Sequence, residues 1–281
     1  MTTLPLKNPF GPPVYYEETL SSTFDAARLL AGQGEPHGTV IAADFQEAGR
    51  GRPKPGARLN DSWTAEKGKN LLFTILLRYG DLAGIPAALT LRTGLAVSLA
   101  IEDLAPALAG DVLVKWPNDV MIRERNAEAA CNVKPSIKAE AAFKAAGILT
   151  ETDGKNVFIG VGVNVGQTEF PEGYRSKAGS IIRAFPGLPE NARFILLGKI
   201  LSRLYEEIEN PVNGFSWREP LLKRLYKRGE TVSFAEGLAG SDRLIEGTLS
   251  GIGEAGELLI IPEGEEKERA YVTGELRVYG L

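Results

Sequence analysis

The positions of apolar and polar residues along the chain predict its elements. Apolar residues at helical spacing follow Ser21, Ser22 and Thr23, whose hydroxyl groups suit the start of a helix, and this spacing ends at Gly32. The same spacing predicts helices over residues 85–104, 191–209 and 220–228. We expect the helix over residues 85–104 to lie against a sheet.

Short runs of β-branched and apolar residues predict the strands of that sheet. They cover residues 39–45, 70–78, 112–116, 145–151 and 156–165. Asp153 and Gly154, between the last two runs, are a signal for a hairpin turn. The sequence therefore predicts an α+β fold, a mixed and largely antiparallel sheet with helices on one side.

Two further segments predict the domain organisation. Residues 123–142 are rich in alanine and charge and separate two apolar runs, so we expect a surface insertion there. After residue 228 the chain changes to short runs broken by glycine, which predict a small β-barrel. These runs cover residues 231–234, 244–250, 258–261 and 275–279. The predicted domains are residues 1–228 and 229–281.

Composition excludes several kinds of site. The formal net charge of −4 provides no global field for nucleic acid. Cys131 is the only cysteine and His37 is the only histidine, which excludes a disulfide framework and zinc sites built from several cysteines or histidines. We expect His37 to be a solvated loop residue. The sequence has no leader-like start and no run apolar enough to span a bilayer, so we expect a cytoplasmic protein.

Residues 46–52 are the first of four segments that indicate chemistry. Gly49 and Gly51 alternate with Arg50 and Arg52 at the start of a long loop. Glycines let backbone amides approach an anion, and arginines supply forked donors for a carboxylate or a phosphate. The segment is suited to cradle an acyl phosphate, although a Gly/Arg turn by itself is more often a solvated loop.

The second segment, Lys115-Trp116-Pro117-Asn118-Asp119, ends a predicted strand. Pro117 fixes a turn that presents Asn118 and Asp119. Oxygen ligands on a rigid turn are what Mg²⁺ beside a phosphate chain requires. The alternative is an Asn-Asp turn that caps itself.

The third and fourth segments lie on two predicted strands. In residues 144–151, Lys144 stands at the mouth of a buried strand and Gly147 permits close approach of a ligand. A lysine at this place can equally be a solvated strand end. In residues 159–165, Gly160 and Gly162 share one face of a strand because side chains alternate. They predict a bare groove that would admit a flat ring.

Taken in order, the four segments resemble those of the bacterial biotin protein ligases. In that family a Gly-Arg-Gly-Arg loop, a Lys-Trp-Pro-Asn-Asp turn, a Lys-x-x-Gly-Ile-Leu-x-Glu strand and a Gly-x-Gly-x-Asn strand recur. The resemblance implies a catalytic fold like that of class II aminoacyl-tRNA synthetases, followed by an SH3-like barrel. It also implies that biotin and ATP, with Mg²⁺, form biotinyl-5′-AMP, and that biotin then passes to a lysine of a biotin carboxyl carrier protein domain.

The resemblance also implies roles for individual residues. Those expected to bind biotin are Ser22, Thr23, Gln46, Gly49, Arg50, Gly51, Arg52, Lys144, Gly147, Gly160 and Gly162. Those expected to bind ATP are Arg52, Trp63, Asn70, Lys115, Asn118, Lys144 and Asn164, and Asn118 and Asp119 are expected to place the metal ion. The expected catalytic residues are Lys144, Arg50 and Arg52. An ammonium at Lys144 can bridge the attacking carboxylate and the α-phosphate as charge gathers between them.

The sequence departs from the family pattern in two places. Phe24 stands where an asparagine usually follows Ser-Thr, and residues 53–62 make the arginine-bearing loop longer than its usual form. The winged helix-turn-helix domain of the family's repressors would have to precede Ser21, so we expect a ligase that does not bind DNA. We also expect no membrane contact. Homodimer formation is left open. A lipoate or octanoate ligase and a non-catalytic biotin-adenylate sensor are the alternatives.

Overall fold

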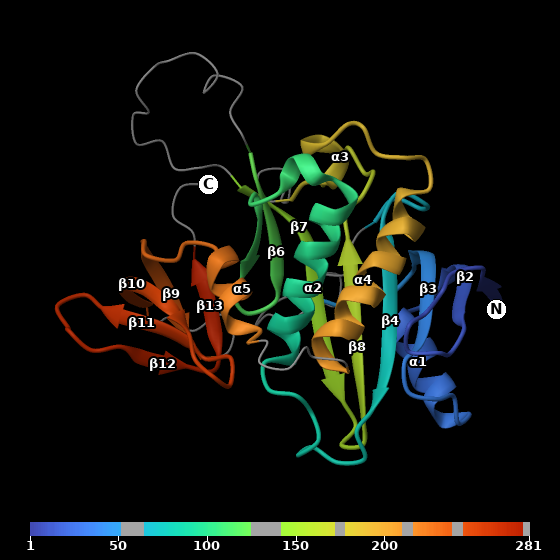
Figure 1. Cartoon of the computed structure of the whole chain (residues 1–281), viewed down its shortest axis with the longest axis horizontal. Helices are drawn as coiled ribbons and strands as arrows, with labels where there is room; N and C mark the ends of the chain where they lie inside the picture. The colour runs from blue at the N-terminus through green and yellow to red at the C-terminus, as the bar shows by residue number, and fades with distance from the viewer. Residues whose placement is uncertain (52–64, 125–141, 172–177, 210–215, 238–243, 278–281) are drawn as a thin grey trace.

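A computed structural model describes residues 1–51, 65–124, 142–171, 178–209, 216–237 and 244–277. Eight strands form one sheet in the order β1-β2-β3-β4-β8-β7-β6-β5 (Figure 1). They are β1 (Thr2–Leu4), β2 (Val14–Leu20), β3 (Thr39–Gln46), β4 (Leu71–Arg78), β5 (Val112–Lys115), β6 (Asp119–Arg123), β7 (Ala142–Thr152) and β8 (Asn156–Val163). Only β2 and β3 pair in parallel, so this sheet is mixed and mostly antiparallel, as predicted.

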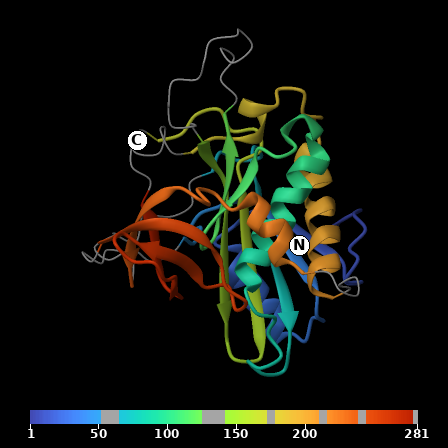
Figure 2. The ribbon, with the colours of Figure 1, turned by 60° about the vertical axis from the view of Figure 1, so that its left-hand side comes forward.

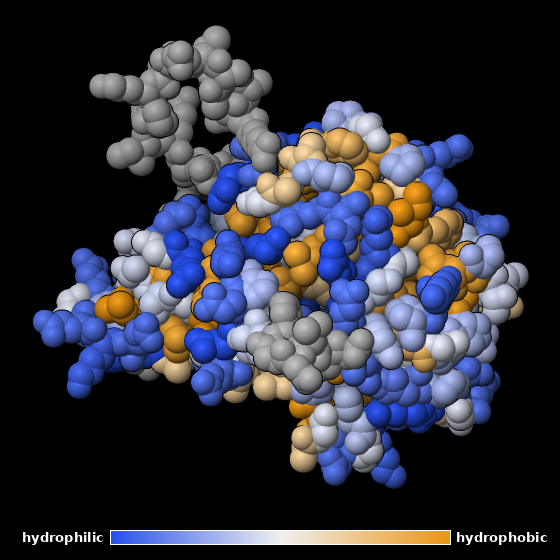
Figure 3. Space-filling model, viewed as in Figure 1, coloured by the Kyte–Doolittle hydropathy of each residue, from blue (hydrophilic) through white to orange (hydrophobic). Residues whose placement is uncertain are grey.

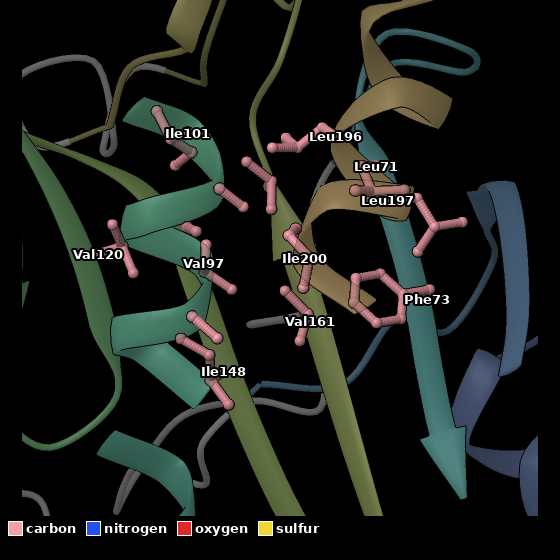
Figure 4. Packing of buried hydrophobic residues seen from close by; sticks show 14 of the residues in the cluster. Leu71, Phe73, Val97, Ile101, Val120, Ile148, Val161, Leu196, Leu197 and Ile200 are labelled. Carbon is pink, nitrogen blue, oxygen red and sulfur yellow. The ribbon is translucent and has the colours of Figure 1, made fainter. Parts of the chain in front are cut away.

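Helices α2 (Leu89–Leu104) and α4 (Ala192–Ile208) lie side by side on one face of this sheet (Figures 1 and 2). Each helix buries the stripe of apolar residues that recurs at helical spacing. Figure 4 shows Val97 of α2 and Ile200 of α4 packed near Val161 of β8, and all three belong to one buried cluster. The main hydrophobic core therefore lies between this face and the two long helices.

Helix α1 (Thr23–Gly32) packs on the opposite face, which corrects the prediction of helices on one side. The reason lies in β4, which is apolar on both faces and buried along nearly all of its length. A strand of that kind needs cover on both sides. Phe24 and Leu30 of α1 provide it by packing with Ile41, Leu76 and Phe158.

A second, five-stranded sheet follows α5 (Arg218–Arg224), with the order β12-β11-β10-β9-β13. Its strands are β9 (Thr231–Glu236), β10 (Leu244–Ile252), β11 (Leu258–Pro262), β12 (Arg269–Tyr271) and β13 (Gly274–Arg277). Each run predicted after residue 228 corresponds to one of these strands, and β12 is additional. The smaller C-terminal sheet is therefore confirmed.

Trp116 joins the two sheets. Its ring is buried in one cluster with Leu95 of α2 and with Phe234 and Leu258 of the second sheet. The indole Nε1 donates a hydrogen bond of 3.0 Å to the carbonyl oxygen of Gly256. Trp116 therefore packs between the two parts of the chain rather than facing solvent.

His37 is also more closely held than expected for a solvated loop residue. Its Nδ1 accepts a hydrogen bond of 3.0 Å from the backbone N–H of Arg78, and its Nε2 lies 3.2 Å from a carboxylate oxygen of Glu209. Phe10 and Tyr79 contact its ring. His37 therefore has a structural role at the end of β4.

The short helices α3 (Ile181–Ala184) and η1 (Pro106–Leu108) complete the described elements. Hydrophilic residues predominate on the face seen in Figure 3, and apolar residues form separate patches on it. None of the helices in the described segments has the length and apolar character needed to cross a membrane. The predicted insertion over residues 123–142 lies almost wholly outside the described residues.

Candidate functional site

Two glycines form the floor of the candidate site. Val161 and Val163 of β8 belong to the core beneath α2 and α4, so Gly162 between them faces the other side of the sheet. Gly162 pairs with Gly147 of β7 on one side and with Leu72 of β4 on the other. We call Gly147 and Gly162 the glycine strip. Glycines side by side on adjacent strands leave that part of the sheet without side chains.

A β-bulge brings Lys144 to the same face. Val120 of β6 pairs with Ala146, but the next residue, Met121, pairs with Lys144, so Ala145 is an extra residue in β7. Ala145 and Ala146 are both fully buried in the main core. Without the bulge, strict alternation would place Lys144 on the core face with Ala146. With it, the ammonium is on the face of the glycine strip, because a bulge can redirect a side chain.

Asp119 is the ion-pair partner of Lys144. The Lys144 Nζ lies 2.6 Å from Oδ1 of Asp119, and the two side chains are 34% and 19% exposed. Asp119 pairs in register with Gly147, so the pair borders the glycine strip. The predicted turn residue Asn118 is fixed by a hydrogen bond of 2.8 Å from its Nδ2 to the carbonyl oxygen of Ile148. The second and third predicted segments therefore meet here.

The parallel pair β2–β3 brings another polar group to this face. Parallel strands end at the same edge, and Leu20 at the end of β2 lies beside Gln46 at the end of β3. The backbone N–H and the hydroxyl of Thr23 donate to Oε1 of Gln46 at 2.8 and 3.0 Å. The Thr23 hydroxyl also accepts a hydrogen bond of 2.8 Å from Thr74 of β4. No sequence motif contains Thr74, so this role could not be predicted from the sequence.

Ser22 and Phe24 flank Thr23 at the start of α1. Ser22 is the N-cap, and its hydroxyl accepts a hydrogen bond of 3.2 Å from the backbone N–H of Phe24. The Phe24 ring lies against Gly160, where a β-carbon would be only 2.2 Å from Cε2 of the ring. The bare groove predicted along Gly160 and Gly162 is therefore filled at Gly160. Gly162 stays partly exposed.

Arg50 lies at the end of the glycine strip that is away from Lys144. It forms ion pairs with Asp25 of α1 and with Glu151 of β7, and Glu151 also pairs with Arg28. The guanidinium carbon of Arg50 is 5.9 Å from the centre of the Phe24 ring. Along β7, Lys144 and Glu151 stand on opposite sides of Gly147, so Arg50 and Lys144 lie at opposite ends of the strip.

The remaining predicted residues fall into four groups. Asn70 and Asn164 are 0% and 4% exposed, and their amides bond within the chain to Gln167 and Gly179. Lys115 is half-buried at the end of β5, in the same register row as Asp119 and Gly147. Gly49 is buried and Gly51 is exposed, on either side of Arg50. Arg52 and Trp63 lie outside the described residues.

The donor set suits a metal ion that arrives with a ligand. The described residues contain no group of three or more His, Cys, Asp or Glu side chains that could hold one. One carboxylate at Asp119 and one amide oxygen at Asn118 supply two oxygen ligands at most. Mg²⁺ is commonly held by one or two carboxylates together with substrate phosphates and water. This corner therefore fits Mg²⁺ bound to a phosphate chain.

The fold and the site define a mixed-sheet α/β protein with a small C-terminal sheet and a glycine-floored strip between two cations. No family model matches the chain. It is 30% identical over 208 residues to the biotin–[acetyl-CoA-carboxylase] ligase of Mycobacterium tuberculosis, which covers 72% of this chain and 63% of that protein. It is 32% identical over 181 residues to the bifunctional ligase/repressor BirA of Bacillus subtilis, and this match covers 62% of the chain.

The comparison with solved structures gives the same family. The biotin protein ligase of Aquifex aeolicus in complex with biotin and ATP matches with a TM-score of 0.70 and 26% identity, over 94% of this chain and 97% of that one. The chain spans about half the length, 47%, of the BirA protein that it matches. In sequence and in fold, the chain is therefore similar to biotin protein ligases.

Proposed function

We propose that the chain is an ATP-dependent biotin protein ligase. It would form biotinyl-5′-AMP and transfer the biotinyl group to a lysine of a biotin carboxyl carrier protein domain. The observation that supports this proposal most is the bulge at Ala145, which puts the Lys144 ammonium beside the glycine strip. A cation placed on a strip without side chains suits an acid that lies flat on the sheet with its carboxylate at Lys144.

In the first step, an oxygen of the biotin carboxylate attacks the α-phosphorus of ATP. The new P–O bond forms as the bond to pyrophosphate breaks, and no proton is transferred. Negative charge gathers on the α-phosphate oxygens, and a fixed ammonium next to them lowers the barrier. Lys144 is the group that would supply it. Thr23 and Gln46 would hold the ureido ring, because a hydroxyl and an amide can both donate and accept hydrogen bonds.

The nucleotide would occupy the side of the strip that carries Lys115 and Asn118. Bound to the phosphates, Mg²⁺ would neutralise part of their charge, with Asn118 and Asp119 as its protein ligands. Arg50, with Gly49, Gly51 and Arg52, would cover the acyl-adenylate and exclude water. Trp63 would lie against the adenine. These roles are carried by the sequence motifs together with the geometry at Lys144.

In the second step, the amine of the carrier lysine attacks the acyl carbon of biotinyl-5′-AMP. The N–C bond forms, the C–O bond to AMP breaks, and the amine loses one proton to solvent or to a base. The second sheet would be an SH3-like barrel appended to a catalytic fold of the class II synthetase type. Its five short antiparallel strands support that assignment.

Pyrophosphate release measured with biotin, ATP and Mg²⁺ tests the proposal. We expect release that depends on biotin and falls at least a hundredfold in Lys144→Ala. Lys155→Ala is the matched control, because Lys155 is an exposed lysine in the hairpin at the far end of β7 and β8. Release that needs lipoate or octanoate instead of biotin would identify the related ligase. Binding of biotin and ATP with no release would identify a sensor.

A further inference from the structure

Phe24 lies beside the candidate site, and its neighbours in the sequence do not account for that position. It follows Ser22 and Thr23, and its backbone N–H bonds to the Ser22 hydroxyl. The ring turns away from solvent and is 4% exposed. It packs with Ile41, Leu76 and Phe158 in the cluster beneath α1. Phe24 is therefore the residue of that cluster nearest to the N-terminal end of the helix.

The position of the ring relative to the sheet follows from strand register. Gly160 pairs with Thr74 on β4 and with Leu149 on β7, two residues along the strands from the row of Gly162 and Gly147 and therefore on the same face. A β-carbon on Gly160 would meet three ring atoms of Phe24 at 2.2, 2.6 and 3.1 Å. The ring therefore lies directly on the backbone of Gly160 and next to the glycine strip.

We infer that Phe24 is a specificity-determining residue that closes one side of the acid-binding strip. This inference rests on the proposed function. Lys144 marks the end of the strip where a carboxylate would lie, and Thr23 and Gln46 mark the ring end. Phe24 adjoins Thr23, so the ring end of the acid meets an aromatic wall instead of open sheet.

Arg50 stabilises this wall from above. Its guanidinium carbon lies 5.9 Å from the centre of the Phe24 ring. Ion pairs with Asp25 and Glu151 hold the guanidinium in place. The ring is thus enclosed between the Gly160 backbone and Arg50 and has little room to rotate away. A wall that cannot move should reject acids with added bulk on their bicyclic end, because overpacking a well-filled site is unfavourable.

A ratio of two acids tests this inference. Biotin and a biotin with a methyl group on a ureido nitrogen are compared as substrates for pyrophosphate release, in the wild-type chain and in Phe24→Ala. The methyl group removes the same hydrogen-bond donor in both proteins, so that loss cancels. We expect the ratio of kcat/KM, methylated acid over biotin, to rise at least tenfold in Phe24→Ala.

Leu30→Ala is the control, since Leu30 belongs to the same cluster on the same helix. It should leave the ratio within twofold of the wild-type value. If Phe24→Ala does not fold, Phe24→Leu is measured in the same way, because leucine lacks the far edge of the ring. A ratio unchanged in the folded variant, with biotin still turned over, overturns the role of Phe24 alone. Absence of biotin-dependent release in the wild-type chain overturns the proposed function.

Discussion

The indole nitrogen of Trp116 donates a hydrogen bond of 3.0 Å to the carbonyl oxygen of Gly256. Trp116 precedes Asn118 by two residues in the sequence. The second sheet is thereby tied to the turn that presents Asn118 and Asp119. Phe234 supports the same indole with a ring-to-ring distance of 5.9 Å. The motif residue Trp116 therefore fixes the position of the turn through the second sheet.

Trp116→Phe should lower the free energy of unfolding by about 1–3 kcal/mol, because it leaves the Gly256 carbonyl without its donor and removes part of a buried ring. Urea denaturation of the two proteins measures the change. Trp217→Phe is the control, since Trp217 is only partly buried at the edge of the same cluster. Equal losses in the two variants would argue against a special role for the Trp116 bond.

Asp25→Asn should increase the affinity of the site for an anionic ligand. Asp25 and Glu151 place two carboxylates around Arg50, at the other end of the strip from Lys144. Removing one of these negative charges makes the whole site more positive, so we expect KM for biotin to fall about two- to fivefold, on the scale of one exposed ion pair.

The free energy of unfolding of Asp25→Asn should change by less than about 1 kcal/mol, because exposed ion pairs contribute little to stability. Glu18→Gln is the matched control, since it breaks the exposed pair with Lys67 away from the strip. Steady-state pyrophosphate release gives KM for both variants. A KM that rises in Asp25→Asn would show that the Asp25 pair helps to place Arg50 for the ligand.

Gly160→Ala should destabilise the chain by about 1–3 kcal/mol, because the added methyl group overlaps the buried Phe24 ring. The same change in a Phe24→Ala background should cost less than about 0.5 kcal/mol, because the overlap is gone. Denaturation of the four proteins in this double-mutant cycle measures the coupling. Additive effects would place the ring somewhere other than over Gly160.

Tyr79 should make the fold sensitive to alkaline pH. Burial raises the pKa of its hydroxyl from 10.0 to about 12, and the nearby carboxylate of Glu209 adds to the shift. The folded pKa is above the unfolded one, so this contribution to stability is complete below pH 10 and is lost as the pH rises towards 12. The loss corresponds to about 2–3 kcal/mol at most.

Tyr79→Phe measures that contribution. Its unfolding free energy should fall less than that of the wild-type chain between pH 9 and pH 11.5, although Tyr16, whose pKa is also raised to about 12, still titrates in both proteins. Denaturant unfolding across this range gives the two slopes. Equal slopes would mean that the Tyr79 hydroxyl ionises as freely in the folded chain as in the unfolded one.

Much of the fold follows from local patterns. The predicted strands over 39–45 and 156–165 correspond to Thr39–Gln46 and Asn156–Val163, and the predicted helix over 191–209 corresponds to Ala192–Ile208. The helix buries a regular stripe and the two strands are short, nearly continuous apolar runs, so both patterns are visible in the sequence. Strand β2 is not, because the polar residues of Val14–Leu20 mask the strand pattern and its parallel partner lies far along the chain.

The geometry of the candidate site was less accessible than its residues. The motifs name Lys144 and Asp119, but the register that joins them depends on the bulge at Ala145, and no local pattern predicts an extra residue in a strand of alanines. Likewise, Phe24 can be seen as a departure from the family pattern, but its contact with Gly160 requires the position of α1 on the sheet. Non-local packing decides both.

The extra alanine at position 145 means that strand length, as well as residue type, controls where the ammonium points. Deletion of Ala145 would restore strict alternation and turn Lys144 toward the hydrophobic core beneath α2 and α4, where a charged group is strongly disfavoured. One missing neutral residue would then disable the site while every charged side chain stayed in the sequence. A relative that keeps the motif letters but differs by one position in this strand should therefore not be assumed to share the chemistry.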